Sequence, residues 1–470
     1  MLSTLKTYLR YTSWPIIAAM VALVAVGITA IHVSEQSDST IQGFTNRQMV
    51  FAAVALGVFV FMTIVPYQRV GRLSYVLFGL TLVVLAAVFF LPRSIAPEIR
   101  GSRRWIDLGV MMVQLSEIAK FAFIVMLAWY LRQGDNYRRL RGLIVPFVLT
   151  LAPMALVLLE PDLGTSLLLL PTLYMLLFVA GAKLRHLLVI LALGLLAVLC
   201  PAPRPVDADA FAAQRESFVE SSLGPVTFYW VDESLDWSRR PELPVAYCRC
   251  RIGSGPLYDI QPLSLRIMQP HQVRRIKAWL RPDDPRIARN EGYQPEKGKM
   301  ILGSGRWTGR GDWNNTESYF TMLPDDHTDF IFSVIGGQWG FLGCLAVLGL
   351  YGVIFLFGVE IATITYDPFG RLLAVGVMAL LLSQLVINAG MTMGLMPVTG
   401  MTLPLVSYGG SSLVINCAAL GLLVNVGQRR PILLSRRPFE YGQKRERQPA
   451  IAQTQGLGKL TDNGRNTQAT

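Results

Sequence analysis

The chain has 470 residues, of which 52% are hydrophobic and only 16% are charged. A soluble domain carries roughly a quarter charged residues, so this composition excludes a soluble globule. The formal net charge of +12 does not indicate nucleic acid, because the basic residues lie between apolar segments and in the C-terminal tail. We therefore expect an integral membrane protein with no nucleic-acid partner.

About ten apolar segments follow one another along the chain, each near the length of a membrane-crossing helix. They lie at 14–33, 49–66, 74–92, 117–131, 143–159, 164–182, 186–201, 329–357, 371–395 and 403–427. This pattern predicts an all-α polytopic membrane protein. Helices one to seven fall within 1–201, helices eight to ten within 329–428, and a large extracytoplasmic loop, 202–328, separates them.

Basic residues mark alternate connections between the predicted helices. They are Arg69, Arg72, Arg132, Arg138, Arg139, Arg141, Lys183 and Arg185. Cytoplasmic loops are enriched in Lys and Arg, so we expect both termini to be cytoplasmic. The basic tail, 429–470, is then cytoplasmic too, and its polar composition is typical of disorder.

The first outward connection, 93–116, contains adjacent arginines, Arg103 and Arg104, followed by Trp105. Guanidinium groups suit phosphate oxygens, so these residues favour an anionic ligand. Alternatively, the arginines reach lipid headgroups while Trp105 anchors the interface.

Acidic residues occur at the start of the fourth helix and between the fifth and sixth. Glu117 and Lys120 lie three residues apart on one helix face, which fits either an internal ion pair or a catalytic role, and both should face the bundle interior. The turn Glu160–Ser166 places two carboxylates at the outer mouth of two helices. Asp162 is either a helix N-cap or a group that orients a cation or sugar hydroxyl.

The outer loop has two parts with different patterns. Its first part, 203–270, shows no clear period and contains Cys248 and Cys250, which are too close to bridge each other. From 271 to 280, an amphipathic pattern predicts a helix that lies either at the membrane interface or on an ordinary surface. Its apolar face would present Val273, Ile276, Trp279 and Leu280, with Arg274 and Arg275 opposite.

The segment 297–332 carries the densest group of candidate residues. Lys297 and Lys299 precede glycines with interleaved arginines, and His327, Thr328 and Asp329 precede the eighth apolar run. Asp329 should lie partly desolvated at the outer boundary, where it could act as a general base for a hydroxyl. Alternatively, it is an acidic residue favoured at a helix start by the helix dipole.

The connection 394–412 contains two prolines, several glycines and a polar cluster within an apolar region. Irregular backbone at membrane depth must be buried in protein or line a cavity. This connection therefore marks a site or a tight packing joint.

Taken in order, GSRRWIDLG, SEIAK, PDLGTS, GSG, HTDFIF and PLVSYGGSS resemble the SEDS family (shape, elongation, division and sporulation), which includes RodA and FtsW. The resemblance runs from about Gly101 to Gly427 and leans towards the RodA branch. It implies a ten-helix bundle in the bacterial inner membrane that polymerises lipid II at the outer face for cell-wall elongation and cell shape. It also implies a class B penicillin-binding protein transpeptidase as partner, with other elongation or division proteins.

By position, Asp329 matches the family's essential acid, expected to deprotonate the acceptor 4-hydroxyl. That hydroxyl would attack the anomeric carbon and expel undecaprenyl pyrophosphate, which Arg103 and Arg104 would neutralise. No cofactor is specified, although a divalent cation, Mg²⁺ or Mn²⁺, near the pyrophosphate is chemically reasonable. The candidate substrate-binding residues are Arg103, Arg104, Trp105, Glu117, Lys120, Asp162, Lys299, His327, Thr328, Ser407, Tyr408, Gly409, Gly410 and Ser411.

The sequence departs from the family in places and leaves two other functions open. Glu160 stands where the family usually has Gln, and 203–270 is far longer than the usual loop. A lipid II flippase would also need cavity arginines and intramembrane carboxylates. A non-catalytic scaffold of the wall-synthesis complex is the third hypothesis. The activating partner and the role of the insertion stay undetermined by the sequence.

Overall fold

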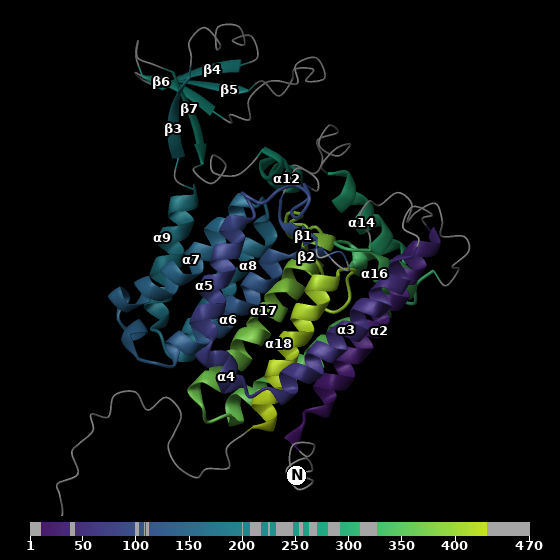
Figure 1. Ribbon diagram of the computed structural model, residues 1–470. Coiled ribbons are helices and arrows are strands. Elements are labelled where there is room, and N and C mark those ends of the chain that lie inside the picture. The colour runs from purple at the N-terminus through teal and green to yellow at the C-terminus, as the bar shows by residue number, and fades with distance from the viewer. Residues whose placement is uncertain are drawn as a thin grey trace, which may run out of the picture.

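A bundle of long helices forms the body of the molecule, and a small sheet projects from one end of it (Figure 1). The computed structural model describes residues 11–37, 43–98, 103–107, 109, 112–199, 201–206, 218–223, 226–231, 248–252, 257–262, 270–280, 292–310 and 327–429. The predicted tail after 429 lies outside these residues.

Each predicted apolar segment corresponds to one helix among the described residues. They are α2 (Trp14–Ser37), α3 (Phe44–Ile64), α5 (Ser74–Ala87), α6 (Leu115–Leu131), α7 (Ile144–Leu159), α8 (Leu163–Ala180), α9 (Leu184–Leu199), α16 (Ile331–Ile364), α17 (Pro368–Thr392) and α18 (Gly410–Gln428). Within the described part of the chain, seven helices are long and apolar enough to cross a membrane, whereas α5 and α9 are shorter apolar helices. The predicted polytopic helical fold is confirmed; the number of spans stays a prediction.

Among the described helices that are long enough to cross a membrane, α17 and α18 are the most buried. In the most apolar 18-residue stretch of each helix, 72% of α17 and 83% of α18 is buried inside the bundle, compared with 17% of α3. The helix α17 contacts α6, α8, α16 and α18, and α18 packs along α3. A helix that is apolar all round is typical of such a central position.

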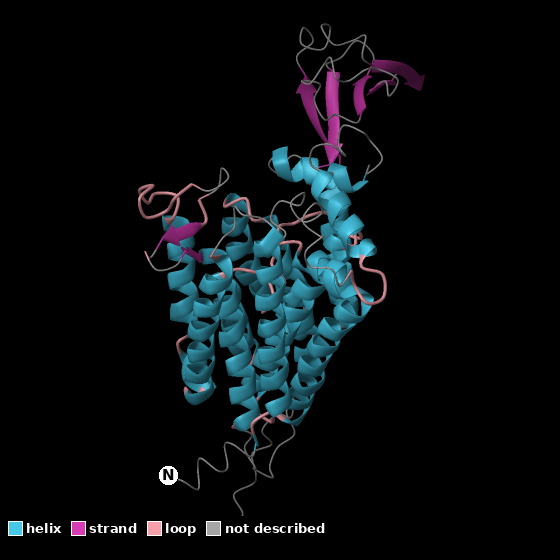
Figure 2. Cartoon of the chain, turned by 90° about the vertical axis from the view of Figure 1, so that its right-hand side faces the viewer, coloured by secondary structure: helices cyan, strands magenta, loops and turns pink. Residues whose placement is uncertain are grey.

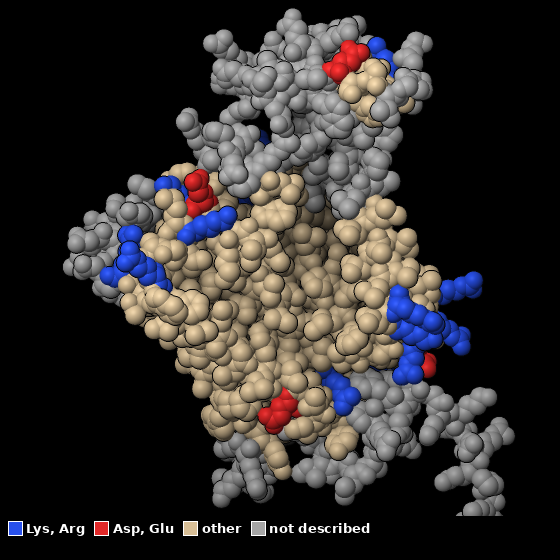
Figure 3. Space-filling model, turned by 180° about the vertical axis from the view of Figure 1, so that it is seen from behind, with Lys and Arg blue, Asp and Glu red and all other residues tan. Residues whose placement is uncertain are grey.

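The two ends of the bundle differ in what they carry. The start of α2 and the end of α18 lie at one end, with α4 (Tyr67–Arg72), whereas α12 (Pro270–Leu280) and α14 (Tyr293–Ser304) lie at the other (Figure 1). The described strands all lie at this second end, the upper one in Figure 2. On the face shown in Figure 3, charged side chains gather towards the ends and leave an uncharged belt between them. This distribution is that of a bundle crossing a hydrocarbon layer.

The outer segment holds a five-stranded antiparallel sheet that the sequence did not predict. Its strands are β3 (Pro201–Val206), β4 (Phe218–Leu223), β5 (Val226–Val231), β6 (Cys248–Ile252) and β7 (Leu257–Pro262), in the order β3-β7-β6-β5-β4. No secondary structure was predicted for 203–270, so this sheet is an addition to the predicted helical bundle. Alternate prolines in β3 argue against a strand, whereas the alternation of Cys and Arg in β6 is a strand signal that the prediction did not use.

The helix expected at 271–280 is confirmed as α12, while α14 was not predicted. A break in α16 holds the turn that follows α14. Gly340 has φ 66° and ψ −161°, outside helical geometry. Beyond the break, the amide of Phe341 donates to the carbonyl of Arg306 at 2.8 Å, and Leu342 donates to Trp307 at 3.1 Å. These bonds fix α14 against the outer half of α16.

Candidate functional site

Asp329 lies at the end of the bundle that carries α12 and α14, directly before α16. Its side chain is half-buried, and the helix N-cap is the next residue, Phe330, which makes no side-chain cap bond. Asp329 is thus not the N-cap residue of α16, and its favourable interaction with the helix dipole stays an alternative to a role in catalysis.

The backbone before α16 is held by three different donors. The amide of Tyr408 donates to the carbonyl of His327 at 2.9 Å, and the hydroxyl of Ser407 donates to the backbone carbonyl of Thr328 at 2.5 Å. The side-chain amide of Asn388 donates to the carbonyl of Asp329 at 2.9 Å. Three consecutive carbonyls therefore have partners, and the segment cannot shift without breaking these bonds.

The turn around Gly400 lies beside the carboxylate. Asn388 also donates to the carbonyl of Met401 at 2.6 Å, which ties this turn to Asp329. Gly400 has φ +72°, and a Cβ built on it would lie 3.4 Å from Oδ2 of Asp329 and 3.4 Å from Nη1 of Arg275. Gly400 thus brings a carboxylate oxygen and a guanidinium from α12 onto one small surface.

His327 packs into an aromatic cluster next to the same turn. Its ring lies edge-on to Phe44 and Tyr408, with centroids 5.1 and 5.6 Å away. Phe44 and Tyr408 stack on each other at 4.7 Å. Gly409 donates its amide to Gln48 at 3.3 Å, and Gly410 and Ser411 then open α18. Of the predicted residues 407–411, Ser407 and Tyr408 therefore support the backbone of 327–328, whereas Gly409 bonds to α3.

Asp162 is a hydrogen-bonding centre between α6 and α8. It accepts from the amide of Thr165 at 3.1 Å as the N-cap of α8. It also accepts from Gln114, Ser116 and the hydroxyl of Thr165, each at 2.9 Å. The N-cap interpretation is confirmed, and four bonds leave this carboxylate little capacity for a ligand.

Glu117 and Lys120 form the ion pair that their spacing suggested. Nζ of Lys120 lies 2.7 Å from Oε1 of Glu117, and the two residues are 1% and 4% exposed. Oε2 of Glu117 has no hydrogen-bond partner. The pair is buried in the bundle, where removing one partner would leave an uncompensated charge.

Glu160 is a buried acid in the turn between α7 and α8. It is 0% exposed, and neither carboxylate oxygen has a hydrogen-bond partner. Burial, with the nearby charge of Asp162, raises the pKa of Glu160 to about 8, against a smaller opposing effect of Arg104. At neutral pH Glu160 is mostly protonated, so it does not neutralise Arg104.

The remaining predicted residues lie around this end of the bundle. Arg103 and Arg104 are half-buried in the segment leading into β1 (Trp105–Asp107), which pairs with β2 (Met112–Gln114). Lys299, on α14, packs its ammonium against Gly394, where a Cβ would lie 2.2 Å from Nζ. The turn of Asp162 meets the Gly400 turn through Gly164, which packs against Met401.

Eight of the predicted residues fall into two sets that differ in their partners. His327, Thr328, Asp329, Ser407 and Tyr408 form one bonded unit, whereas Asp162, Glu117 and Lys120 have separate partners. Among the described residues no three His, Cys, Asp or Glu side chains group as metal ligands. The divalent cation near the pyrophosphate stays a prediction.

Asn388, Arg275 and Trp279 contact this region and were not proposed as site residues. Asn388 is a polar side chain inside the ninth apolar run, which is the signal that could have revealed it. The two α12 residues could not be placed, because their amphipathic pattern fits a lipid surface equally well.

Comparisons with known proteins cover most of the chain. Residues 10–217 and 253–431 match the cell cycle protein family of FtsW, RodA and SpoVE. The chain is 31% identical over 434 residues to "Peptidoglycan glycosyltransferase RodA" of Treponema pallidum, covering 88% of this chain and 97% of that protein. It is 29% identical over 392 residues to "Peptidoglycan glycosyltransferase MrdB" of Escherichia coli K12, covering 83% and 87%.

Solved structures agree with the sequence comparison. One, described as "Structural coordination of polymerization and crosslinking by a peptidoglycan synthase complex", matches with TM-score 0.63 and 28% identity over 90% of this chain and 99% of that chain. The crystal structure of the Rod shape determining protein RodA of Thermus thermophilus matches with TM-score 0.56 and 26% identity over 89% and 98%. All the candidate site residues lie within the matched segments.

Proposed function

The chain belongs to the FtsW, RodA and SpoVE family, and from this premise we propose that it is a peptidoglycan glycosyltransferase with Asp329 as its general base. It is a multi-pass protein of the cytoplasmic membrane. The observation that supports Asp329 most directly is the bonded unit around 327–329. That unit holds a half-buried carboxylate beside Gly400 and Arg275.

The reaction joins two lipid-linked sugars of lipid II. Asp329 accepts the proton of the acceptor hydroxyl, whose oxygen attacks the anomeric carbon of the donor. The bond from that carbon to the pyrophosphate breaks, and undecaprenyl pyrophosphate leaves with inversion at the carbon. A base positioned in this way contributes about 10²–10⁴-fold to the rate.

Arg103 and Arg104 would stabilise the charge on the leaving pyrophosphate. Guanidinium groups form strong bidentate bonds with phosphate oxygens. The protonated state of Glu160 at neutral pH supports this role, because an ionised acid beside Arg104 would compete with the ligand for its charge. Fixed cations aimed at developing charge are a large source of catalysis in enzymes.

The membrane orientation and the partner belong to the same proposal. Both termini would be cytoplasmic, which places the basic connections inside and Asp329 at the outer face. The partner would be a class B penicillin-binding protein transpeptidase. A solved relative is described as part of a complex that coordinates polymerization and crosslinking, which supports this choice.

The test is polymerisation of lipid II by the purified chain with its partner. Asp329→Ala should lower the rate of glycan-strand formation by about 100-fold or more, because the base is removed. Asp367→Ala is the matched control: it removes a carboxylate from the N-cap of α17 at the opposite end and should leave the rate nearly unchanged. Full activity of Asp329→Ala would overturn the assignment.

A further inference from the structure

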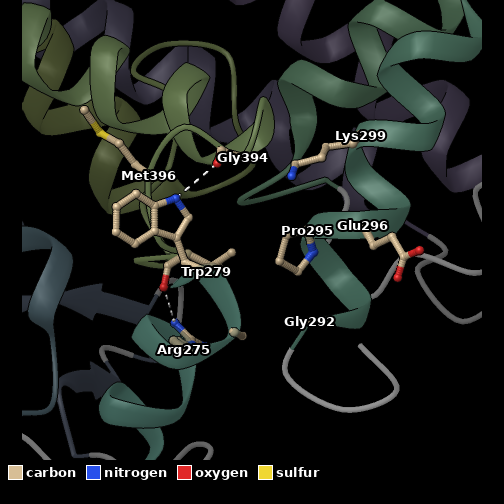
Figure 4. A pocket seen from close by; sticks show the side chains of 10 residues that line it. Arg275, Trp279, Gly292, Pro295, Glu296, Lys299, Gly394 and Met396 are labelled. Atoms are coloured by element: carbon tan, nitrogen blue, oxygen red, sulfur yellow. Dashed lines mark hydrogen bonds between the residues drawn. The ribbon is translucent and has the colours of Figure 1, made fainter. Parts of the chain in front are cut away.

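A cavity of about 180 Å³ lies between α12, α14 and the turn that follows α17. Its wall includes Arg275, Trp279, Glu296, Lys299, Gly394 and Met396. Figure 4 shows Arg275 and Trp279 on one side and Pro295, Glu296 and Lys299 on the other. Whole-ligand pockets measure about 300–1,000 Å³, so this cavity suits one ring or headgroup of a larger ligand.

Trp279 supplies an anchored aromatic surface to the cavity. Its indole N–H donates to the carbonyl of Gly394 at 3.1 Å, while the side chain is still 40% exposed. The hydrogen bond limits the rotation of the ring. An indole face carries partial negative charge and attracts the polarised C–H bonds on one face of a pyranose ring.

The cations of the cavity favour an anionic substituent on that ring. The amino group of Lys299 turns towards Gly394 and the cavity, whereas the carboxylate of Glu296 points away from it (Figure 4). Arg275 adds a guanidinium, which lies 3.5 Å from the carbonyl of Val398. Charge-assisted bonds from Lys and Arg are the usual way that proteins hold a carboxylate.

Arg275 connects the cavity to the general base. It lines the cavity, and both its Nη1 and Oδ2 of Asp329 lie 3.4 Å from the position that a Cβ on Gly400 would take. A ligand seated against Trp279 would therefore extend past Arg275 towards Asp329. The hydroxyl that reacts would belong to the part of the ligand nearest Asp329.

We propose that this cavity is a saccharide subsite for the acceptor, in which a pyranose ring packs on Trp279 and its carboxylate-bearing substituent binds Lys299 and Arg275. The proposal rests on the proposed polymerase function. The subsite would recognise the sugar of the acceptor independently of its pyrophosphate and lipid. The proposal therefore predicts that a lipid-free sugar binds.

The test measures equilibrium binding of the lipid-free disaccharide–pentapeptide to the purified full-length protein. Saturation-transfer NMR and calorimetry detect the binding. The wild type should bind it. Trp279→Ala should weaken binding by about tenfold or more, the scale expected for losing a stacked ring, and Lys299→Gln should weaken it as well. Trp279→Phe retains an aromatic ring and should bind within about threefold of the wild type, which separates stacking from misfolding.

Two controls complete the design. Trp307→Ala removes another exposed tryptophan, which packs on Phe341 outside the cavity, and should leave binding unchanged. Asp329→Asn should still bind the probe while losing polymerisation. Binding therefore tests the subsite, and polymerisation tests the proposed function independently. No binding by the wild type, equal binding of the pentapeptide alone, or full binding by both Trp279→Ala and Lys299→Gln would overturn the subsite.

Discussion

The position of the Asp329 carboxylate depends on hydrogen bonds that other residues donate to the backbone of 327–329. Asn388 donates both to the carbonyl of Asp329 and to the turn at Met401, so one buried amide sets the position of the base. Glu160 acts differently, through its protonation state next to Arg104. Neither residue would touch the reacting atoms, so each is a positioning or tuning residue, and each predicts a distinct measurement.

Asn388→Ala should lower kcat for lipid II polymerisation by about tenfold or more with a smaller change in KM. Losing the hydrogen bonds leaves buried carbonyls unpaired, at a cost of about 1–3 kcal/mol, and frees the segment that carries Asp329. Asn416→Ala is the matched control, because Asn416 is an equally buried Asn that bonds to Ser412 on α18. Equal losses of activity in both variants would contradict a specific role for Asn388.

Glu160→Gln should change how stability depends on pH. The pKa of Glu160 is raised from its ordinary 4.5 to about 8. Between these two pH values the folded protein keeps a proton on Glu160 that the unfolded chain releases. This contribution to stability is complete below about pH 4.5 and is lost as the pH rises to about 8. The variant, neutral at every pH, should therefore gain in thermal midpoint over the wild type as the pH rises.

Thermal midpoints at pH 6 and pH 9 in detergent test this sign. We expect the advantage of Glu160→Gln to be larger at pH 9, by a few degrees, since about 1 kcal/mol moves the midpoint of a 150–250-residue protein by about 2–4 °C. Glu360→Gln changes an exposed acid on α16 and should show no such trend. A constant or shrinking advantage would mean that Glu160 is ionised in the folded protein.

At the scale of elements, the sequence predicted the helices well and their irregular joints poorly. Apolar runs reveal helices because burial in lipid demands long apolar segments, so Asp329 could be placed at a helix start. The break at Gly340 could not be predicted, because it depends on the turn after α14 meeting α16. Asn388 escaped for a similar reason: only the folded chain brings it to Asp329 and Met401.

Gly340→Ala should destabilise the protein and weaken activity. A Cβ at this position would lie 2.4 Å from the amide nitrogen of Gly309 and 2.6 Å from that of Thr308, at a φ of +66°. Backbone strain of about 1–3 kcal/mol adds to an overpacking cost of similar size. Gly349→Ala is the control on the same helix, because a Cβ there meets nothing within 4 Å. Equal thermal midpoints of the two variants would contradict the packed break.

At the scale of the molecule, the outer sheet is an addition to a bundle that is otherwise typical of the family. The family match stops at 217 and resumes at 253, and the skipped stretch contains β4, β5 and β6. The strands β3 and β7 pair directly with each other, from Pro201 with Pro262 to Val206 with Leu257. The hairpin that leaves and re-enters the bundle therefore does not require the inserted strands.

Replacing 218–252 by a short Gly/Ser linker should leave the fold and the polymerase activity in place. We expect a thermal midpoint within a few degrees of the wild type and lipid II polymerisation within about threefold, because flexible loops of different length differ little in closure entropy. Loss of polymerisation with an intact fold would assign part of the site, or of the partner interface, to the sheet.

The most direct test of the whole account follows two signals in one preparation of vesicles that contain lipid II, the purified chain and its partner. We predict that the wild type forms glycan strands, and that Asp329→Asn, which keeps the shape but not the base, forms them at least about 100-fold more slowly. Strand formation by Asp329→Asn at the wild-type rate would contradict the account. Lipid II translocation by the wild type without strand formation would favour a transporter.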